Sequence, residues 1–244
     1  LGLNGLFDNI LTVLSLTELG IGPAIIFSLY SPLANHDLET AKSIMRIFKK
    51  AYIYIGTLIL FLGLCISPFV QYLIKVPPNI AYLNIFFLLF VVDTGISYFY
   101  SYKKCLLIAD QKQYIANYYR GITQLIGSLF QIALVILTHS FWVYIILRIC
   151  MTFSENFLIA RKADHLYSFL NEKNIQPLNK DIYQNIIRNI KALILHKIGG
   201  VTVFGTSNII LSKFVGLSAV ALYTNYYLII NGIDKLSDQV FNAL

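Results

Sequence analysis

Several ionisable side chains stand inside long apolar stretches of the sequence, where a charge is costly to keep. They are Asp8, Glu18, Asp93, Arg148, Glu155, His196 and Lys197, and the candidates for a functional site are Glu18, Asp93, Arg148, Glu155 and Lys197. A charge at the centre of a membrane-spanning helix costs about 2.5 to 3.5 kcal/mol, so such residues usually face a polar cavity or a partner. We therefore expect these side chains to line a pathway for a polar or charged substrate.

Arg148 is the strongest of these candidates, because its planar guanidinium is suited to holding a phosphate. Glu155 follows seven residues later, on the same face of a helix but about 10 Å farther along its axis. The two are too far apart to pair, so each should contact another helix or a ligand. The alternative for Arg148 is a salt bridge with Asp93 or Glu18 that only holds helices together.

The other charged positions leave two interpretations open. Glu18 and Asp93 lie deep in their stretches, which favours either a water-filled cavity or a hydrogen bond between helices. Asp8 and Lys197 lie near the ends of theirs, which favours side chains that reach towards water or headgroups.

A break is expected where Gly20, Gly22 and Pro23 interrupt the first apolar stretch. Proline removes a backbone donor, and the two glycines loosen the helix before it. Such interruptions recur in transporters, where helices move about the weak point. These residues are therefore hinge candidates, and an ordinary proline kink is the alternative.

The elements that position these residues are seven apolar stretches. A bilayer core of about 30 Å needs roughly 20 apolar helical residues, and 57% hydrophobic against 13% charged residues is far from a soluble balance. The sequence predicts an all-α fold, a polytopic transmembrane helix bundle of about seven spans. The spans are expected at about 4–34, 47–74, 80–102, 114–137, 141–163, 190–212 and from 217 onward.

Every second connection between these spans is rich in Lys and Arg, namely 35–50, 101–120 and 161–191. This alternation follows the positive-inside rule and places those connections in the cytoplasm. The basic residues adjoin apolar spans, so we expect contact with membrane lipid and no nucleic-acid partner.

The segment 166–190 is a seam between two groups of helices. It is expected either to hold an amphipathic surface helix or to lengthen the first turn of the next span. The predicted division is 1–165, an N-terminal lobe, then 166–190, a cytoplasmic linker, then 191–244, the start of a second lobe. The chain opens without Met and stops within a helical pattern, which favours an internal fragment.

Motifs of familiar enzymes are absent from the sequence. It contains no Walker-type glycine loop, no HExxH and no Gly-x-Ser-x-Gly. We therefore expect no enzyme, no cofactor and no metal site, although the deep acids leave proton or sodium coupling open.

The first 75 residues contain a series of short motifs that are familiar together. They are Leu3-Asn4-Gly5-Leu6-Phe7, Leu14-Ser15-Leu16, Glu18-Leu19-Gly20-Ile21-Gly22, Tyr30-Ser31-Pro32-Leu33-Ala34, Ile44-Met45, Lys49-Lys50-Ala51-Tyr52, Ile55-Gly56 and Pro68-Phe69. With these residues the chain resembles the polysaccharide flippases, which export O-antigen and teichoic acid and belong to the multidrug/oligosaccharidyl-lipid/polysaccharide exporter superfamily.

The resemblance implies a two-lobed parent of about twelve to fourteen spans, of which this chain holds spans two to eight. It implies a multi-pass protein of a bacterial or archaeal cytoplasmic membrane that flips a lipid-pyrophosphate-linked oligosaccharide by alternating access, with polysaccharide polymerase or assembly proteins as partners. Cations in the family's cavity hold the pyrophosphate, a role open here to Arg148 and Lys197. A cation-coupled multidrug exporter and a non-transporting scaffold for a glycan synthase remain alternatives.

Overall fold

A computed structural model describes residues 2–18, 20–74, 82–172, 178, 180–204 and 206–241. These residues form helices and turns and no strand, which confirms the all-α fold. The helices are α1 (Gly2–Leu14), the 3-10 helix η1 (Ser15–Glu18), α2 (Ile21–Ala34), α3 (Leu38–Ile66), the 3-10 helix η2 (Ser67–Leu73), α4 (Leu83–Ala109), α5 (Gln113–Thr138), α6 (Phe141–Leu166), the 3-10 helix η3 (Ser168–Asn171), α7 (Lys180–Phe204), α8 (Ser207–Phe214) and α9 (Leu217–Phe241).

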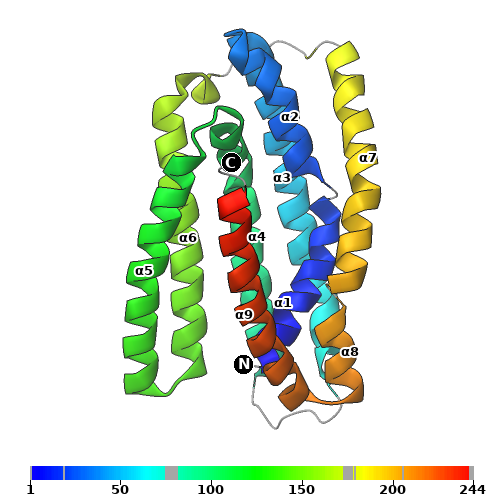
Figure 1. Ribbon diagram of the computed structural model, residues 1–244, viewed down its shortest axis with the longest axis vertical. Coiled ribbons are helices and arrows are strands. Elements are labelled where there is room, and N and C mark those ends of the chain that lie inside the picture. The colour runs from blue at the N-terminus through cyan, green and yellow to red at the C-terminus, as the bar shows by residue number, and fades with distance from the viewer. Residues whose placement is uncertain are drawn as a thin grey trace.

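Helix α4 lies at the centre of the bundle and packs against α2, α3 and α6. Helices α5 and α6 form a hairpin on one side, and α7 and α8 stand on the opposite side (Figure 1). Helix α9 packs against α1 and α8. Segments distant in sequence therefore meet around α1 and α4.

Four helical segments of the described chain are long and apolar enough to cross a membrane: 38–73, 83–109, 113–138 and 141–166. They coincide with the second to fifth of the seven expected spans. The first expected span is instead divided into α1, η1 and α2, and the sixth is divided between α7 and α8. The apolar pattern shows the total length of such a stretch but not an interruption of its backbone.

Helices extend farther into the basic connections than the charge pattern indicates. Helix α3 begins at Leu38, so most of the expected loop 35–50 is its first turns. Asp37 caps this helix, since its side chain accepts a hydrogen bond from the backbone N–H of Thr40 at 3.0 Å. The basic side chains of this segment consequently have fixed positions on a helix.

The amphipathic pattern in the segment 166–190 belongs to a continuous helix. Helix α7 runs from Lys180 to Phe204 without interruption and so joins the amphipathic residues to the next apolar stretch. The structure therefore has the second alternative, in which the amphipathic residues extend the start of the next helix and do not form a separate surface helix. The division into two lobes stays a prediction.

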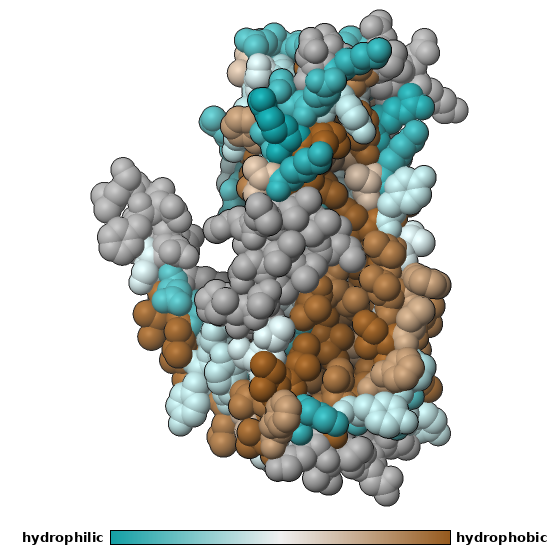
Figure 2. Space-filling view, turned by 90° about the vertical axis from the view of Figure 1, so that its right-hand side faces the viewer, coloured by the Kyte–Doolittle hydropathy of each residue, from teal (hydrophilic) through white to brown (hydrophobic). Residues whose placement is uncertain are grey.

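Polar residues gather at one end of the bundle above a broad apolar band (Figure 2). The N-terminal end of α3 and the C-terminal ends of α2, α4 and α6 lie at that end of the bundle. The short turn between α5 and α6 lies at the opposite end (Figure 1). A belt of exposed apolar side chains is what a helix bundle in lipid requires. The chain therefore has the character of a membrane protein.

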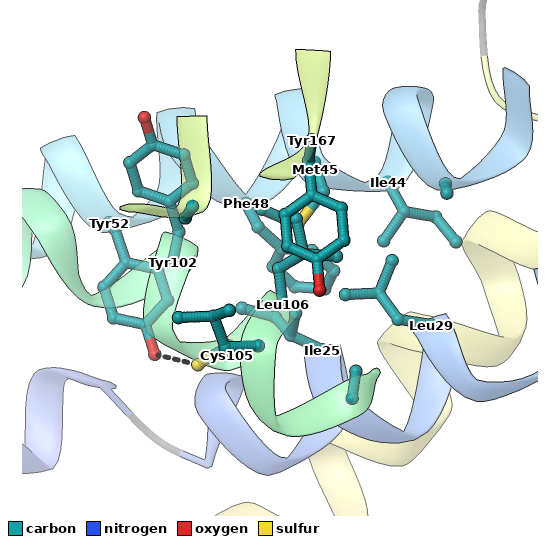
Figure 3. Packing of buried hydrophobic residues seen from close by; sticks show 14 of the residues in the cluster. Ile25, Leu29, Ile44, Met45, Phe48, Tyr52, Tyr102, Cys105, Leu106 and Tyr167 are labelled. Carbon is teal, nitrogen blue, oxygen red and sulfur yellow. Dashed lines mark hydrogen bonds between the residues drawn. The ribbon is translucent and has the colours of Figure 1, made fainter. Parts of the chain in front are cut away.

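The buried core has two parts. One lies towards the basic end and is built from α2, α3 and α4, where Leu29, Phe48 and Leu106 pack together (Figure 3). The other joins α1 to α4, where Phe7 meets the rings of Phe87 and Phe90 edge-on. The ionisable side chains of the spans lie beside these two cores.

Candidate functional site

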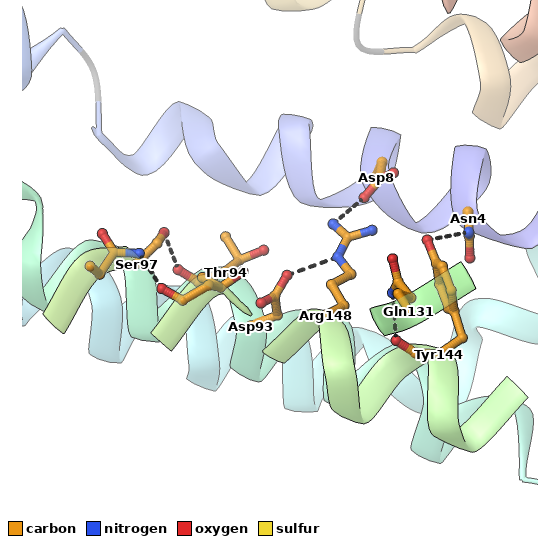
Figure 4. A network of polar contacts seen from close by, with 10 residues as sticks. Asn4, Asp8, Asp93, Thr94, Ser97, Gln131, Tyr144 and Arg148 are labelled. Carbon is orange, nitrogen blue, oxygen red and sulfur yellow. Dashed lines mark hydrogen bonds and ion pairs between the residues drawn. The ribbon is translucent and has the colours of Figure 1, made fainter. Parts of the chain in front are cut away.

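Arg148 binds two carboxylates from two other helices. Its Nε donates to Asp93 Oδ2 at 2.9 Å, and its Nη2 donates to Asp8 Oδ1 at 2.9 Å. The guanidinium also lies over the ring of Phe90, 4.3 Å from its centroid. Helices α1, α4 and α6 thus meet in one charged cluster (Figure 4). We call Asp8, Asp93 and Arg148 the arginine cluster.

The helix repeat places the arginine cluster beside a second polar contact. Asn4 precedes Asp8 by one helical turn on α1, and Tyr144 precedes Arg148 by one turn on α6. The Asn4 side-chain amide donates to the Tyr144 hydroxyl at 2.9 Å. Long polar side chains therefore join α1 to α6 at two successive turns (Figure 4).

The arginine cluster keeps unused hydrogen-bonding capacity within the described part of the chain. Arg148 Nη1 has no hydrogen-bond acceptor there, and Asp93 Oδ1 is buried without a partner. Asp93 is only 8% exposed, whereas Asp8 is 47% exposed. Two carboxylates against one guanidinium leave one negative charge when all three are ionised.

The position of Asp8 adds a partner to its prediction. Its place near the end of the first apolar stretch favours a side chain that reaches towards water or headgroups, and the structure leaves this side chain 47% exposed while pairing it with Arg148. The alternative salt bridge of Arg148 with Asp93 is also present.

Glu18 lies in a different polar cluster, at the break of the first apolar stretch. Its Oε1 accepts a hydrogen bond from the Tyr52 hydroxyl at 3.1 Å, and its Oε2 accepts one from the Tyr98 hydroxyl at 3.3 Å. The Tyr52 hydroxyl is also 3.8 Å from the thiol of Cys105 (Figure 3). This tyrosine cluster, Glu18, Tyr52, Tyr98 and Cys105, connects η1 to α3 and α4.

The hinge candidates surround the same break. Gly20 adopts a left-handed conformation, with φ of 74°, and caps the start of α2. Gly22 and Pro23 lie in the first turn of α2, where a proline costs no backbone hydrogen bond. The chain therefore interrupts before Pro23 rather than bending at it. Movement about this break stays a prediction.

The two remaining candidates are separate from these clusters. Glu155 is 17% exposed and faces Arg120 of α5, with 4.0 Å between Oε1 and Nε. It therefore contacts another helix, away from Arg148. Lys197 belongs to α7, but its side chain lies outside the described residues.

Several partners in these clusters are missing from the sequence-based candidates. Tyr52 and Tyr98 appear as ordinary aromatic residues of a membrane helix, and Asn4 carries no charge. The contact between Asn4 and Tyr144 could have been predicted from the spacing of polar residues. Each lies four residues before a charged member of the arginine cluster and therefore on the same helix face.

Comparisons with protein-family models, with curated proteins and with solved structures gave no match. The resemblance to polysaccharide flippases therefore stands on the residues of the first 75 positions alone.

Proposed function

We propose that the chain belongs to a transporter that flips lipid-pyrophosphate-linked oligosaccharide across the cytoplasmic membrane for surface polysaccharide biosynthesis. The observation that carries this proposal is the guanidinium of Arg148, held among three helices of a largely apolar bundle with Nη1 open. A partly buried guanidinium that is held in a fixed orientation recognises phosphate oxygens through charge-assisted hydrogen bonds. An ion pair that only joins two helices needs one carboxylate, whereas Arg148 has two.

The two carboxylates have unequal parts in this proposal. Asp93 is almost fully buried and fixes the guanidinium through Nε. Asp8 is half-exposed, so an incoming phosphate oxygen competes with it for Nη2 at a lower desolvation cost. Asp93 then orients Arg148 while Asp8 exchanges with the substrate.

Two carboxylates beside an added phosphate repel it, so this scheme favours transport that is coupled to a cation, either a proton or sodium. The two ions are separated by measuring transport in gradients of each.

The broken first span supports a transport cycle. The α-helical backbone of α1 ends in the 3-10 helix η1, and the left-handed Gly20 precedes α2, while the tyrosine cluster ties this junction to α3 and α4. Discontinuous helices beside a polar site are a recurring device of alternating-access transporters. We propose that α1 moves about this junction and carries Asp8 towards or away from Arg148.

The test is complementation of a flippase-null host by the full-length reading frame. Wild type should restore surface polysaccharide, while Arg148→Ala and Arg148→Lys should reduce it at least about tenfold because both lose the oriented fork. The matched control is Arg161→Ala, which removes an exposed arginine that forms no salt bridge with a described residue. Restoration by Arg148→Lys at the wild-type level would contradict the proposal.

A second candidate function is cation-coupled multidrug export. The excess negative charge of the arginine cluster favours it, because a cationic compound is attracted to Asp8 and Asp93. Drug resistance that requires Asp93 and is retained without Arg148 would favour export over flipping. Polysaccharide polymerase or assembly proteins as partners belong to the flippase proposal.

A further inference from the structure

A pocket at the basic end combines cationic walls with an apolar floor. Its volume is about 340 Å³. Helices α3 and α4 and the 3-10 helix η3 enclose it, so it is separate from the arginine cluster. Its lining residues are Lys42, Met45, Arg46, Lys49, Lys50, Ile53, Tyr102, Phe169, Leu170 and Glu172.

The charges of this pocket are unequally satisfied. Lys42 is buried and pairs with Glu39 at 2.7 Å and with Glu172 at 2.6 Å. Its charge is therefore offset from within the chain. By contrast, Arg46, Lys49 and Lys50 are exposed, and none has a carboxylate within salt-bridge distance among the described residues.

The spacing of these three cations puts them on one side of α3. Arg46, Lys49 and Lys50 are three and four residues apart, which aligns their side chains along one helix face. Ile53 continues that face by another turn and is partly exposed. A cationic stretch thus runs directly into an apolar one along the axis of α3.

The floor of the pocket is apolar and preformed. Met45, Tyr102 and Phe169 are each less than a tenth exposed, so their positions are fixed by packing. They come from α3, α4 and η3 in turn. An occupant therefore meets cations at the mouth and packed carbon atoms below.

We propose that this pocket binds the phosphate headgroup of an anionic membrane phospholipid. The headgroup contacts Arg46, Lys49 and Lys50, and the first part of an acyl chain lies against Ile53 and the apolar floor. Basic pockets between helices at the cytoplasmic surface recognise anionic headgroups. A free phosphate shares the charge but leaves the apolar floor without a partner. The proposal rests on membrane insertion and not on flipping.

Native mass spectrometry of the purified full-length protein tests it. The protein is titrated with phosphatidylglycerol and, separately, with phosphatidylcholine. Wild type should retain phosphatidylglycerol in preference. The variant Arg46→Gln with Lys49→Gln and Lys50→Gln should weaken that retention at least about tenfold, since each cation near an anionic headgroup contributes about fivefold.

A matched control removes three cations that do not line the pocket: Lys104→Gln, Arg161→Gln and Lys162→Gln. This variant should bind phosphatidylglycerol like wild type. Ile53→Trp keeps every charge and fills the apolar side, so it should also weaken retention. Equal loss in the control variant would overturn the proposal, because general charge would then explain binding.

Competition by inorganic phosphate separates the two sources of the anion. Millimolar phosphate should leave phosphatidylglycerol bound. Its displacement, or a wild type that holds both lipids equally, would overturn the lipid assignment. A failed flipping assay would not affect these results, because they measure binding without transport.

Discussion

Arg148 bears on both the stability and the proposed activity of the chain. Its two carboxylates approach from separate helices, and one of them is buried. Breaking a buried ion pair by removing one partner is costly because the other charge stays desolvated. Substitutions at this cluster therefore need stability and activity measured together.

Replacing Arg148 alone should destabilise the protein. Arg148→Ala leaves Asp93 buried without its partner, and the expected loss is about 3 kcal/mol. Adding Asp93→Asn removes the uncompensated charge and should recover part of that loss. Thermal unfolding of the detergent-purified variants checks this, and a double variant no more stable than Arg148→Ala would contradict it.

The same double variant distinguishes structure from function at this residue. If Arg148 binds substrate phosphate, the variant with both substitutions should regain stability but not transport. Recovery of transport together with stability would assign Arg148 a purely structural part.

The sequence indicated which charged residues would be deep, but not how they would pair. Asp93 and Arg148 are recognisable because they interrupt apolar runs. Their pairing depends on how α1, α4 and α6 are rotated about their axes, and α4, with its apolar residues on all sides, carries little information about rotation. The pairing of Asp8 with Arg148 was missed because the position of Asp8 along its helix was considered without the partner that faces it.

At the scale of elements, the junction between α1 and α2 is the feature with the clearest backbone requirement. Gly20 has a positive φ, and a Cβ there would lie 2.6 Å from the Cβ of Leu193 on α7. The residue satisfies both a left-handed turn and a close approach between helices. The glycines before Pro23 predicted a break in the helix. The close contact of Gly20 with α7 could not be predicted from the sequence and is seen only in the structure.

Gly20→Ala should destabilise the protein by at least about 1 to 2 kcal/mol, the usual cost of a left-handed alanine. The matched control is Gly121→Ala on α5, where nothing lies within 4 Å of the added Cβ. That change should be neutral or slightly stabilising, because alanine favours a helix. Unfolding midpoints compare the two variants, and equal effects would contradict this account of Gly20.

Pro23→Ala tests the hinge separately. Pro23 occupies the first turn of α2, so the substitution should leave stability within about 0.5 kcal/mol. If the break serves as a hinge, the transport rate should nevertheless fall. A normal rate would assign the proline no mechanical role.

Asp110 connects the turn between α4 and α5 to the C-terminal end of α6. Its carboxylate accepts a hydrogen bond from the Tyr167 hydroxyl at 2.6 Å and pairs with Lys112 at 2.6 Å. Partial burial raises the pKa of Asp110, but the hydrogen bonds from Lys112 and Tyr167 outweigh it and hold that pKa below its ordinary value of 3.8.

A lowered pKa makes the Asp110 contribution to stability dependent on pH. The contribution is complete above the unfolded-state pKa and is lost as the pH falls through the lower folded-state pKa. Asp110→Asn should therefore cost about 1 kcal/mol at neutral pH, with a smaller difference from wild type in acid. Urea unfolding at several pH values checks this, and a difference that grows in acid would contradict it.

The whole molecule has one basic end and a broad apolar belt. The alternation of basic connections predicted this polarity, since charge bias among short connections is visible in any single sequence. The number of uninterrupted spans was harder to predict, because hydropathy sums over a stretch and does not register a break such as that at Gly20. Packing across α1, α8 and α9 depends on contacts between residues far apart in sequence.

Labelling of single cysteines in cells tests the orientation. After Cys65, Cys105 and Cys150 are replaced by Ala, His139→Cys in the turn between α5 and α6 should react with a membrane-impermeant maleimide. Gln111→Cys, in the turn between α4 and α5, should react only after the membrane is permeabilised. The reverse pattern would contradict a cytoplasmic basic end.

The central claim, that Arg148 moves a lipid-linked pyrophosphate across the membrane, is tested most directly by flipping in reconstituted vesicles. Purified full-length protein is placed in liposomes with a fluorescent lipid-pyrophosphate-linked oligosaccharide, and an impermeant reductant reports the outer leaflet. We predict that flipping in vesicles with wild type is faster than in protein-free vesicles. We also predict that the flipping rate of Arg148→Lys is at least about tenfold lower than that of wild type. Equal rates for wild type and Arg148→Lys, or for wild type and empty vesicles, would contradict the claim.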